Sequence, residues 1–220
     1  MRVASGGASV LTVVASLKGG SGKSTLTFNL AIWLALAGER VKTFDLDPQA
    51  TLSDVLEVRQ EEAYEPQVEG VTGLRGMKAA AHDDALMGLV DVGTADLASM
   101  KKAMAMAERI LIPVTPSQAD IWSTQRFVTM VDECCDANRP RVQAFINRGD
   151  THRAVRETDE AAAALVALRG VEFVRPRLHQ RTVYRRSFSE GLGVFELEPR
   201  GKASREFVAL AASLFPEVLQ

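Results

Sequence analysis

The sequence predicts an α/β fold in which a mostly parallel, twisted sheet carries helices on both faces. Short apolar runs rich in β-branched residues alternate along the chain with segments whose apolar residues recur at helical spacing. This alternation is typical of parallel sheets built from βαβ units. A glycine-rich loop follows the first apolar run, and the next two runs carry an aspartate at or near their ends. Since ligands bind beyond the carboxyl ends of the strands in such sheets, these positions are the first candidates for a functional site.

The elements expected in the amino-terminal part follow from local pattern. The β-branched run at 10–16 is a buried strand, and the segment after the loop is a helix because its leucines recur every four residues up to Gly38. Residues 57–77 are charged and contain three glycines, so we expect irregular backbone there, with a short strand near Val68. The elements expected up to residue 92 are strands at 10–16, 40–45 and 86–92, and helices at 24–37 and 51–58.

The carboxyl-terminal part repeats the alternation. Short apolar runs are separated by longer segments with helical spacing. Asp96 precedes one such segment, where a helix cap is the favoured interpretation. The elements expected after residue 92 are strands at 109–114, 142–146 and 171–174, and helices at 95–107, 121–135, 158–168, 183–190 and 202–214.

Length and composition fit one globular domain over residues 1–220, with residues 1–9 as a flexible tail. The formal net charge of -2 excludes a protein that is basic as a whole, so binding to nucleic acid would need a local patch. No apolar run is long enough to span a membrane, and no cleavage site precedes the glycine-rich loop, so we expect no signal peptide. The adjacent Cys134 and Cys135 are too few for a metal cage and fit the reducing cytoplasm.

The most specific motif is the loop between the first strand and the first helix. It reads Lys18-Gly19-Gly20-Ser21-Gly22-Lys23-Ser24-Thr25. Glycines allow backbone N–H groups to surround phosphate oxygens, and the helix start adds its positive end. We expect Lys23 to reach the β- and γ-phosphates and the Ser24 hydroxyl to bind Mg²⁺. The motif therefore predicts that residues 19–25 bind ATP with Mg²⁺; a glycine-rich turn without this role is the alternative.

This loop resembles the deviant Walker A loop of the ParA/MinD family of P-loop ATPases, Lys-Gly-Gly-x-Gly-Lys-[Ser/Thr]. Residues 18–24 match it at every fixed position. The resemblance implies that Lys18 acts in a homodimer, where it crosses the interface to the partner's nucleotide, so that ATP lies between two subunits. It covers nearly the whole chain and is strongest over residues 10–50.

Two acidic segments extend the resemblance. The segment Asp45-Leu46-Asp47-Pro48-Gln49 matches the Asp-x-Asp-Pro-Gln segment of the family. In the family the second aspartate, here Asp47, orients or activates the attacking water. Asp45 would serve the Mg²⁺ shell or hold the loop. The run ending at Asp91 has the form of a Walker B strand, so Ser24, Asp47 and Asp91 are the predicted metal group. Residues 92–96 differ from the family, in which a threonine or cysteine and two prolines follow, so the coupling of hydrolysis to a dimer change stays open.

The strand that ends at Asn147 resembles the family strand whose asparagine contacts adenine. An amide can pair with the edge of that base, which makes Asn147 a candidate; a simple turn asparagine is the alternative.

Basic residues crowd the carboxyl-terminal part although the chain is acidic overall. Arginine and lysine on neighbouring helices can follow a phosphate backbone without reading bases. ParA-type proteins bind DNA non-specifically through this part of the chain, and the resemblance favours Arg185, Arg186, Arg200 and Lys202. A solvated, salt-bridged surface is the alternative.

The resemblance implies a ParA-like ATPase that hydrolyses ATP to ADP and phosphate. An ATP-bound homodimer would coat nucleoid DNA in the cytoplasm, and an adaptor on a plasmid, chromosome locus or protein cargo would stimulate hydrolysis. A MinD-like membrane switch is the first alternative, but residues 206–220 contain no lysine or arginine for a membrane-binding helix. An iron–sulfur carrier would need more cysteines than the adjacent pair. A metabolic ATP-dependent enzyme on the same fold remains the other alternative.

Overall fold

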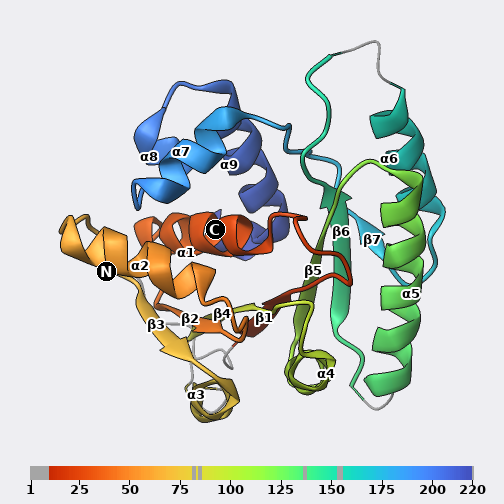
Figure 1. Ribbon diagram of the computed structural model, residues 1–220, viewed down its shortest axis with the longest axis horizontal. Coiled ribbons are helices and arrows are strands. Elements are labelled where there is room, and N and C mark those ends of the chain that lie inside the picture. The colour runs from red at the N-terminus through yellow and green to blue at the C-terminus, as the bar shows by residue number, and fades with distance from the viewer. Residues whose placement is uncertain (1–9, 81–82, 84–85, 136–137, 153–155, 220) are drawn as a thin grey trace.

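Seven parallel strands form a single sheet in the computed structural model, which describes residues 10–80, 83, 86–135, 138–152 and 156–219 (Figure 1). The strand order is β3-β2-β4-β1-β5-β6-β7, and every pairing between neighbours is parallel. The predicted fold class is therefore confirmed, while the expected tail at 1–9 lies outside the described residues. The strands are β1 (Val10–Val14), β2 (Val41–Asp45), β3 (Glu69–Thr72), β4 (Met87–Asp91), β5 (Arg109–Val114), β6 (Arg141–Ile146) and β7 (Glu172–Phe173).

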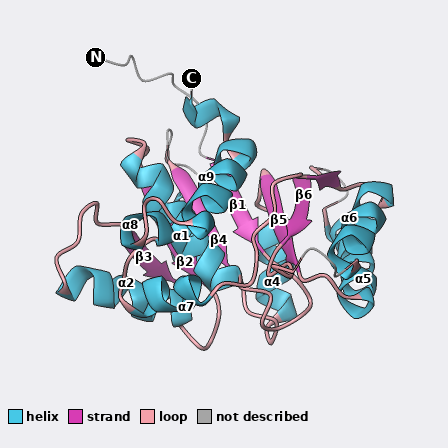
Figure 2. Ribbon diagram, turned by 90° about the horizontal axis from the view of Figure 1, so that it is seen from above, coloured by secondary structure: helices cyan, strands magenta, loops and turns pink. Residues whose placement is uncertain are grey.

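Helices cover both faces of the sheet, and each face has its own apolar core (Figures 1 and 2). On β5, Ile110 and Ile112 belong to one core while Leu111 belongs to the other, which is why this strand is apolar throughout. One face carries α3 (Leu74–Ala80), α4 (Leu97–Met104), α5 (Gln118–Cys134) and α6 (Glu157–Ala167). The other carries α1 (Lys23–Leu36), α2 (Thr51–Glu61), α7 (Thr182–Ser189), α8 (Val194–Leu197) and α9 (Lys202–Leu214), followed by the short helix η1 (Pro216–Leu219).

The segment expected to be irregular is more ordered than the sequence predicted. Helix α2 continues to Glu61, β3 pairs with β2 along 69–72, and α3 covers 74–80. The short strand expected near Val68 is confirmed by β3, whereas the irregular backbone expected around it was wrong for the end of α2 and for α3. Burial of Met77 stabilises α3, although the glycines and charges nearby disfavour regular structure locally. Asp96 caps α4 by accepting a hydrogen bond from Ser99 N at 2.9 Å, as expected.

The carboxyl-terminal helices are joined to α1 and α2 by buried polar contacts. Arg59 of α2 is fully buried and forms two 2.9 Å hydrogen bonds with the carboxylate of Glu196 in α8. The side-chain oxygen of Asn29 in α1 accepts a hydrogen bond from Val194 N at 2.8 Å. These contacts therefore join α8 to α1 and α2.

Within the described ranges, no helix combines the length and hydrophobicity needed to span a membrane. Cys134 and Cys135 are free thiols at the end of α5; Cys135 is buried and Cys134 packs against the same core.

Candidate nucleotide site

The loop after β1 has the backbone that an anion-binding turn requires. Gly20 and Gly22 have φ values of +75° and +86°, which L-residues with a side chain rarely adopt. A Cβ on Gly22 would also lie 2.7 Å from Nδ2 of Asn147. Helix α1 begins at Lys23 without a side-chain cap, so its first N–H groups are left to bind a ligand.

The carbonyl groups of this loop are held by surrounding side chains. The Lys18 carbonyl accepts from the Ser16 hydroxyl at 3.0 Å, and the Ser21 carbonyl accepts from Asn147 Nδ2 at 2.6 Å. The Gly20 carbonyl accepts from the Arg148 guanidinium. Among the described residues, no acceptor binds the backbone N–H groups of residues 19–24. The loop therefore offers a set of N–H donors for an anion such as a phosphate chain.

Lys23 lies at the buried side of the loop, with 8% of its surface exposed. Burial lowers its pKa, whereas the nearby carboxylates of Asp91 and Asp47 favour the charged form and offset part of that effect. Its ammonium group donates to the Lys18 carbonyl at 3.4 Å across the mouth of the loop. The ammonium group of Lys23 is thus positioned to form an ion pair with an anion bound by the loop.

Asp91 ends β4 beside Asp45, with which it is in register on β2. Burial raises the pKa of Asp91 to about 7; the neighbouring Ser24 hydroxyl counteracts this in part. Neither carboxylate oxygen has a partner in hydrogen-bond geometry among the described residues. A buried carboxylate without a partner, next to a hydroxyl and the phosphate loop, fits a site for Mg²⁺.

The described residues contain no group of three or more histidine, cysteine or acidic side chains that could enclose a metal by themselves. A Mg²⁺ ion here would therefore take further ligands from phosphate and water, as this ion usually does.

Asp45 holds the loop that leads from β2 to α2. Its carboxylate accepts hydrogen bonds from the Ser53 N–H and hydroxyl at 3.0 and 2.9 Å, and from Asp47 N at 3.0 Å. Of the two roles considered for Asp45, these contacts favour holding the loop.

Asp47 is half-buried, and one of its carboxylate oxygens accepts from Gln49 N at 3.0 Å. The carboxylate lies directly over Gly93, where an added Cβ would be 2.7–2.8 Å from its carbon and both oxygens. Gly93 lies in the segment 92–96, which differs from the family. Because it has no side chain, it leaves the space that the Asp47 carboxylate occupies.

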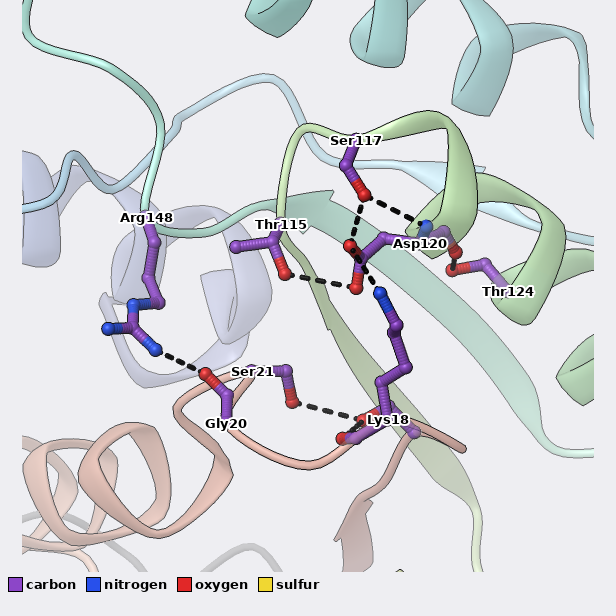
Figure 3. Close-up of polar contacts among 9 residues, drawn as sticks. Lys18, Gly20, Ser21, Thr115, Ser117, Asp120, Thr124 and Arg148 are labelled. Carbon is purple, nitrogen blue, oxygen red and sulfur yellow. Dashed lines mark hydrogen bonds and ion pairs between the residues drawn. The ribbon is translucent and has the colours of Figure 1, made fainter.

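Lys18 pairs with Asp120 at the start of α5, with 3.1 Å between Nζ and Oδ2 (Figure 3). The Thr115 hydroxyl and the Ser117 hydroxyl also donate to this carboxylate. Sequence reasoning missed Asp120. The Ser117-x-x-Asp120 spacing identifies a helix start, but not a partner 102 positions from Lys18.

A cavity of about 440 Å³ adjoins the loop on the side of α7. Its walls come from the start of α1, the end of β6, the segment 178–182 and helices α7 and α9. Asn147 lines it, as a base-contacting residue would, yet its amide already donates to Ser21 and accepts from Arg148 N at 3.0 Å. The adenine contact of Asn147 stays a prediction.

The four cations predicted to bind DNA are exposed on neighbouring elements. Arg185 and Arg186 lie on α7, Arg200 precedes α9, and Lys202 begins it. Arg186 pairs with Glu190 and Glu198 at 3.4 and 3.7 Å, and Arg185 also lines the 440 Å³ cavity. The structure thus brings these residues to one end of the molecule, but their partner stays a prediction.

Comparison with known proteins agrees with a nucleotide site at this loop. A family model described as the CobQ/CobB/MinD/ParA nucleotide binding domain matches residues 12–194. The chain is 29% identical over 200 residues to the maintenance of carboxysome distribution protein A of Halothiobacillus neapolitanus, across 88% of this chain and 90% of that protein.

Two solved structures share the fold. A plasmid partition protein of Borrelia burgdorferi B31 bound to AMPPNP superposes with a TM-score of 0.73 at 15% identity, covering 94% of this chain and 99% of that one. The septum site-determining protein MinD of Pyrococcus horikoshii, complexed with Mg-ADP, gives 0.69 at 20% identity, covering 94% and 96%. At these identities the similarity concerns the fold alone.

Proposed function

Because the chain belongs to the CobQ/CobB/MinD/ParA nucleotide-binding family, we propose that it is a ParA-like ATPase that positions or segregates a cargo in the cytoplasm. The observation that carries the nucleotide-binding part of this proposal is the loop between Lys18 and Lys23, whose N–H groups meet no acceptor among the described residues. Its relatives support the choice within the family, since one is named for carboxysome distribution and a structural neighbour for plasmid partition.

ATP and Mg²⁺ are the proposed ligands. The N–H groups of residues 19–24 and the ammonium of Lys23 would bind the phosphates, while Ser24 and Asp91 would hold the ion. Mg²⁺ held there would supply positive charge that stabilises the phosphate oxygens. Asp47 orients the attacking water, and the space over Gly93 sets where its carboxylate lies.

Lys18 is proposed to act in trans in an ATP-bound homodimer. Its side chain is 44% exposed, and an ion pair at that exposure contributes on the order of 1 kcal/mol or less. The contact with Asp120 can therefore be exchanged for a phosphate of the partner's nucleotide at small cost. This role supports an ATP-dependent switch between a single chain and a dimer.

The dimer is proposed to bind nucleoid DNA without sequence preference, through Arg185, Arg186, Arg200 and Lys202. These cations share one end of the molecule, and buried contacts join that end to α1 and α2. A cargo-bound adaptor would then stimulate hydrolysis and release. The cargo is a protein assembly, a plasmid or a chromosome locus.

ATP-dependent binding to random-sequence duplex DNA tests the proposal. The unmodified chain should shift DNA with ATP and Mg²⁺ and not with ADP, and the affinity should fall steeply with salt. The double substitution Arg200→Glu/Lys202→Glu should abolish the shift while ATP affinity stays unchanged.

The matched control is Lys101→Glu/Lys102→Glu, which makes the same charge change on exposed residues of α4, on the opposite face of the sheet (Figure 1). It should leave the shift nearly intact. Equal loss in both double variants would mean that only net charge matters. Binding to anionic vesicles in place of DNA would favour a membrane-associated regulator instead.

A further inference from the structure

Arg148 joins the phosphate loop to the wall of the neighbouring cavity. Its Nη1 donates to the Gly20 carbonyl, and its Nε donates to Oε1 of Gln180 at 2.6 Å. Figure 3 shows the side chain reaching Gly20 from the end of β6, on the other side of the loop from the Lys18–Asp120 pair. Arg148 is exposed and lines the 440 Å³ cavity together with Gly22 and Thr25.

The backbone of Arg148 is held in an unusual conformation. Its φ is +59°, in the left-handed region that costs a residue with a side chain of order 1 kcal/mol. Such an outlier persists where surrounding contacts fix it, and here the Arg148 N–H donates to Asn147 Oδ1 at 3.0 Å. The same asparagine donates to the Ser21 carbonyl. Two consecutive residues after β6 therefore hold two consecutive carbonyls of the phosphate loop.

Gln180 belongs to a segment that is itself fixed. Its N–H donates to the Gly149 carbonyl at 2.8 Å, and the preceding His179 N–H donates to Glu206 of α9 at 3.2 Å. Residues 178–182 line the 440 Å³ cavity next to Gly22 and Thr25. Arg148 thus connects two parts of the proposed site, the phosphate loop and the cavity that would take the base.

We propose that Arg148 is a positioning residue for nucleotide binding, which holds Gly20 and Gln180 at the separation that one nucleotide requires. The inference rests on the proposed nucleotide-binding function and deepens it. A planar guanidinium can hold two acceptors in fixed geometry, which a lysine ammonium on its flexible stem does less well. Arg148 does not contact the reacting atoms, so its loss should change the affinity for nucleotide and not the turnover number at saturating ATP.

Calorimetric titration of the full-length chain with ATP and with ADP tests the inference. Arg148→Ala should weaken both ligands about tenfold, because about 1–1.5 kcal/mol of hydrogen bonding that orders the loop is lost. Gln180→Ala removes one of the two contacts and should weaken both ligands by a smaller factor, about two- to fivefold. Arg75→Ala, an exposed arginine of α3 on the opposite face, is the control and should bind like the unmodified chain.

Three further readouts separate positioning from a purely structural role. The melting temperature without nucleotide should match that of the control within about 2 °C, since exposed polar contacts contribute little to stability. The KM for basal hydrolysis should rise with Kd while kcat stays within about twofold. Arg148→Lys should recover part of the affinity.

Arg148→Gly gives the sharpest test, because glycine adopts the +59° backbone without strain. Affinity as poor as that of Arg148→Ala is expected. Affinity equal to the unmodified chain would show that only the turn matters and would overturn the inference, as would unchanged Kd in Arg148→Ala. If the unmodified chain binds neither nucleotide, the proposed function fails first and this inference with it.

Discussion

Lys18 and Lys23 belong to the same loop but lie in opposite environments, one exposed and one buried. This difference in burial distinguishes their proposed roles. Lys23 is 8% exposed, faces Asp91 and Asp47, and has a pKa lowered by burial. The Lys18 side chain is 44% exposed and pairs with Asp120 at 3.1 Å. Electrostatic interactions are stronger where water is excluded, so Lys23 can add much to anion binding, whereas Lys18 is held by a weak, exchangeable contact. Lys23 is therefore suited to hold an anion within the loop, whereas Lys18 can exchange its contact with Asp120 for another partner.

Removing the buried lysine should have the largest effect. Lys23→Ala should weaken ATP binding at least about 100-fold, because a desolvated charge partner of the phosphates is lost. Calorimetry measures the change, with Lys18→Ala as the matched control. Unchanged ATP affinity in Lys23→Ala would refute the assignment of the phosphate loop.

A second test addresses Asp47, which is half-buried and so lies between Lys23 and Lys18 in exposure. Asp47→Ala should bind ATP with nearly unchanged affinity but hydrolyse it about 100-fold more slowly or worse, because the residue proposed to orient the water is gone. The ATP-bound dimer should accumulate in gel filtration. Full turnover in this variant would move the catalytic role to another residue.

Gly93→Ala should also slow ATP hydrolysis, but less than Asp47→Ala does. The added methyl group would lie 2.7–2.8 Å from the Asp47 carboxylate and push it aside, and a displacement of this kind lowers hydrolysis by about tenfold or more. Phosphate release at saturating ATP measures it. A turnover number equal to that of the unmodified chain would mean that Asp47 acts from another position.

The buried acid gives a stability test in the absence of nucleotide. The pKa of Asp91 is about 7 in the folded chain against an ordinary value of 3.8. Between these pH values the folded chain binds more protons than the unfolded chain, so stability falls as pH rises and the loss is complete above about 7.

Asp91→Asn should therefore raise the free energy of unfolding by about 1–2 kcal/mol at pH 8, since the loss of a counter-charge for Lys23 offsets part of the gain. Near pH 4 the difference should vanish. Urea unfolding at both pH values measures it, and an equal difference at the two values would contradict a buried, ionised Asp91.

The smallest effect is expected at the exposed lysine. Lys18→Ala should change the free energy of unfolding by less than about 1 kcal/mol, because a half-exposed ion pair contributes little. ATP affinity of the single chain should change only a few-fold, whereas ATP-dependent dimer formation should be lost. Chemical denaturation and light scattering measure the two quantities, and a dimer formed normally by this variant would refute the action in trans.

Local pattern predicted the positions of most strands and helices, since apolar periodicity reflects burial directly. Within residues 57–77 it predicted the short strand near Val68, which the structure has at 69–72, but it missed the last turn of α2 and helix α3. Helix α3 is fixed by Met77, which is fully buried in the core below the sheet edge, and β3 by pairing with β2. Neither contact can be seen within a short window of sequence.

The sequence alone determined the glycine-rich loop after β1 and the acids at and just after the ends of β2 and β4, because these are short segments whose conformation depends on neighbouring residues. Tertiary structure decided the contacts that complete the site: Asp120 with Lys18, Gly93 beneath Asp47, and Arg148 between Gly20 and Gln180. Each joins segments separated by tens of residues or more. The reason is the strand order, since placing β4 and β5 on either side of β1, with β6 beyond β5, brings the loops after these strands around one loop.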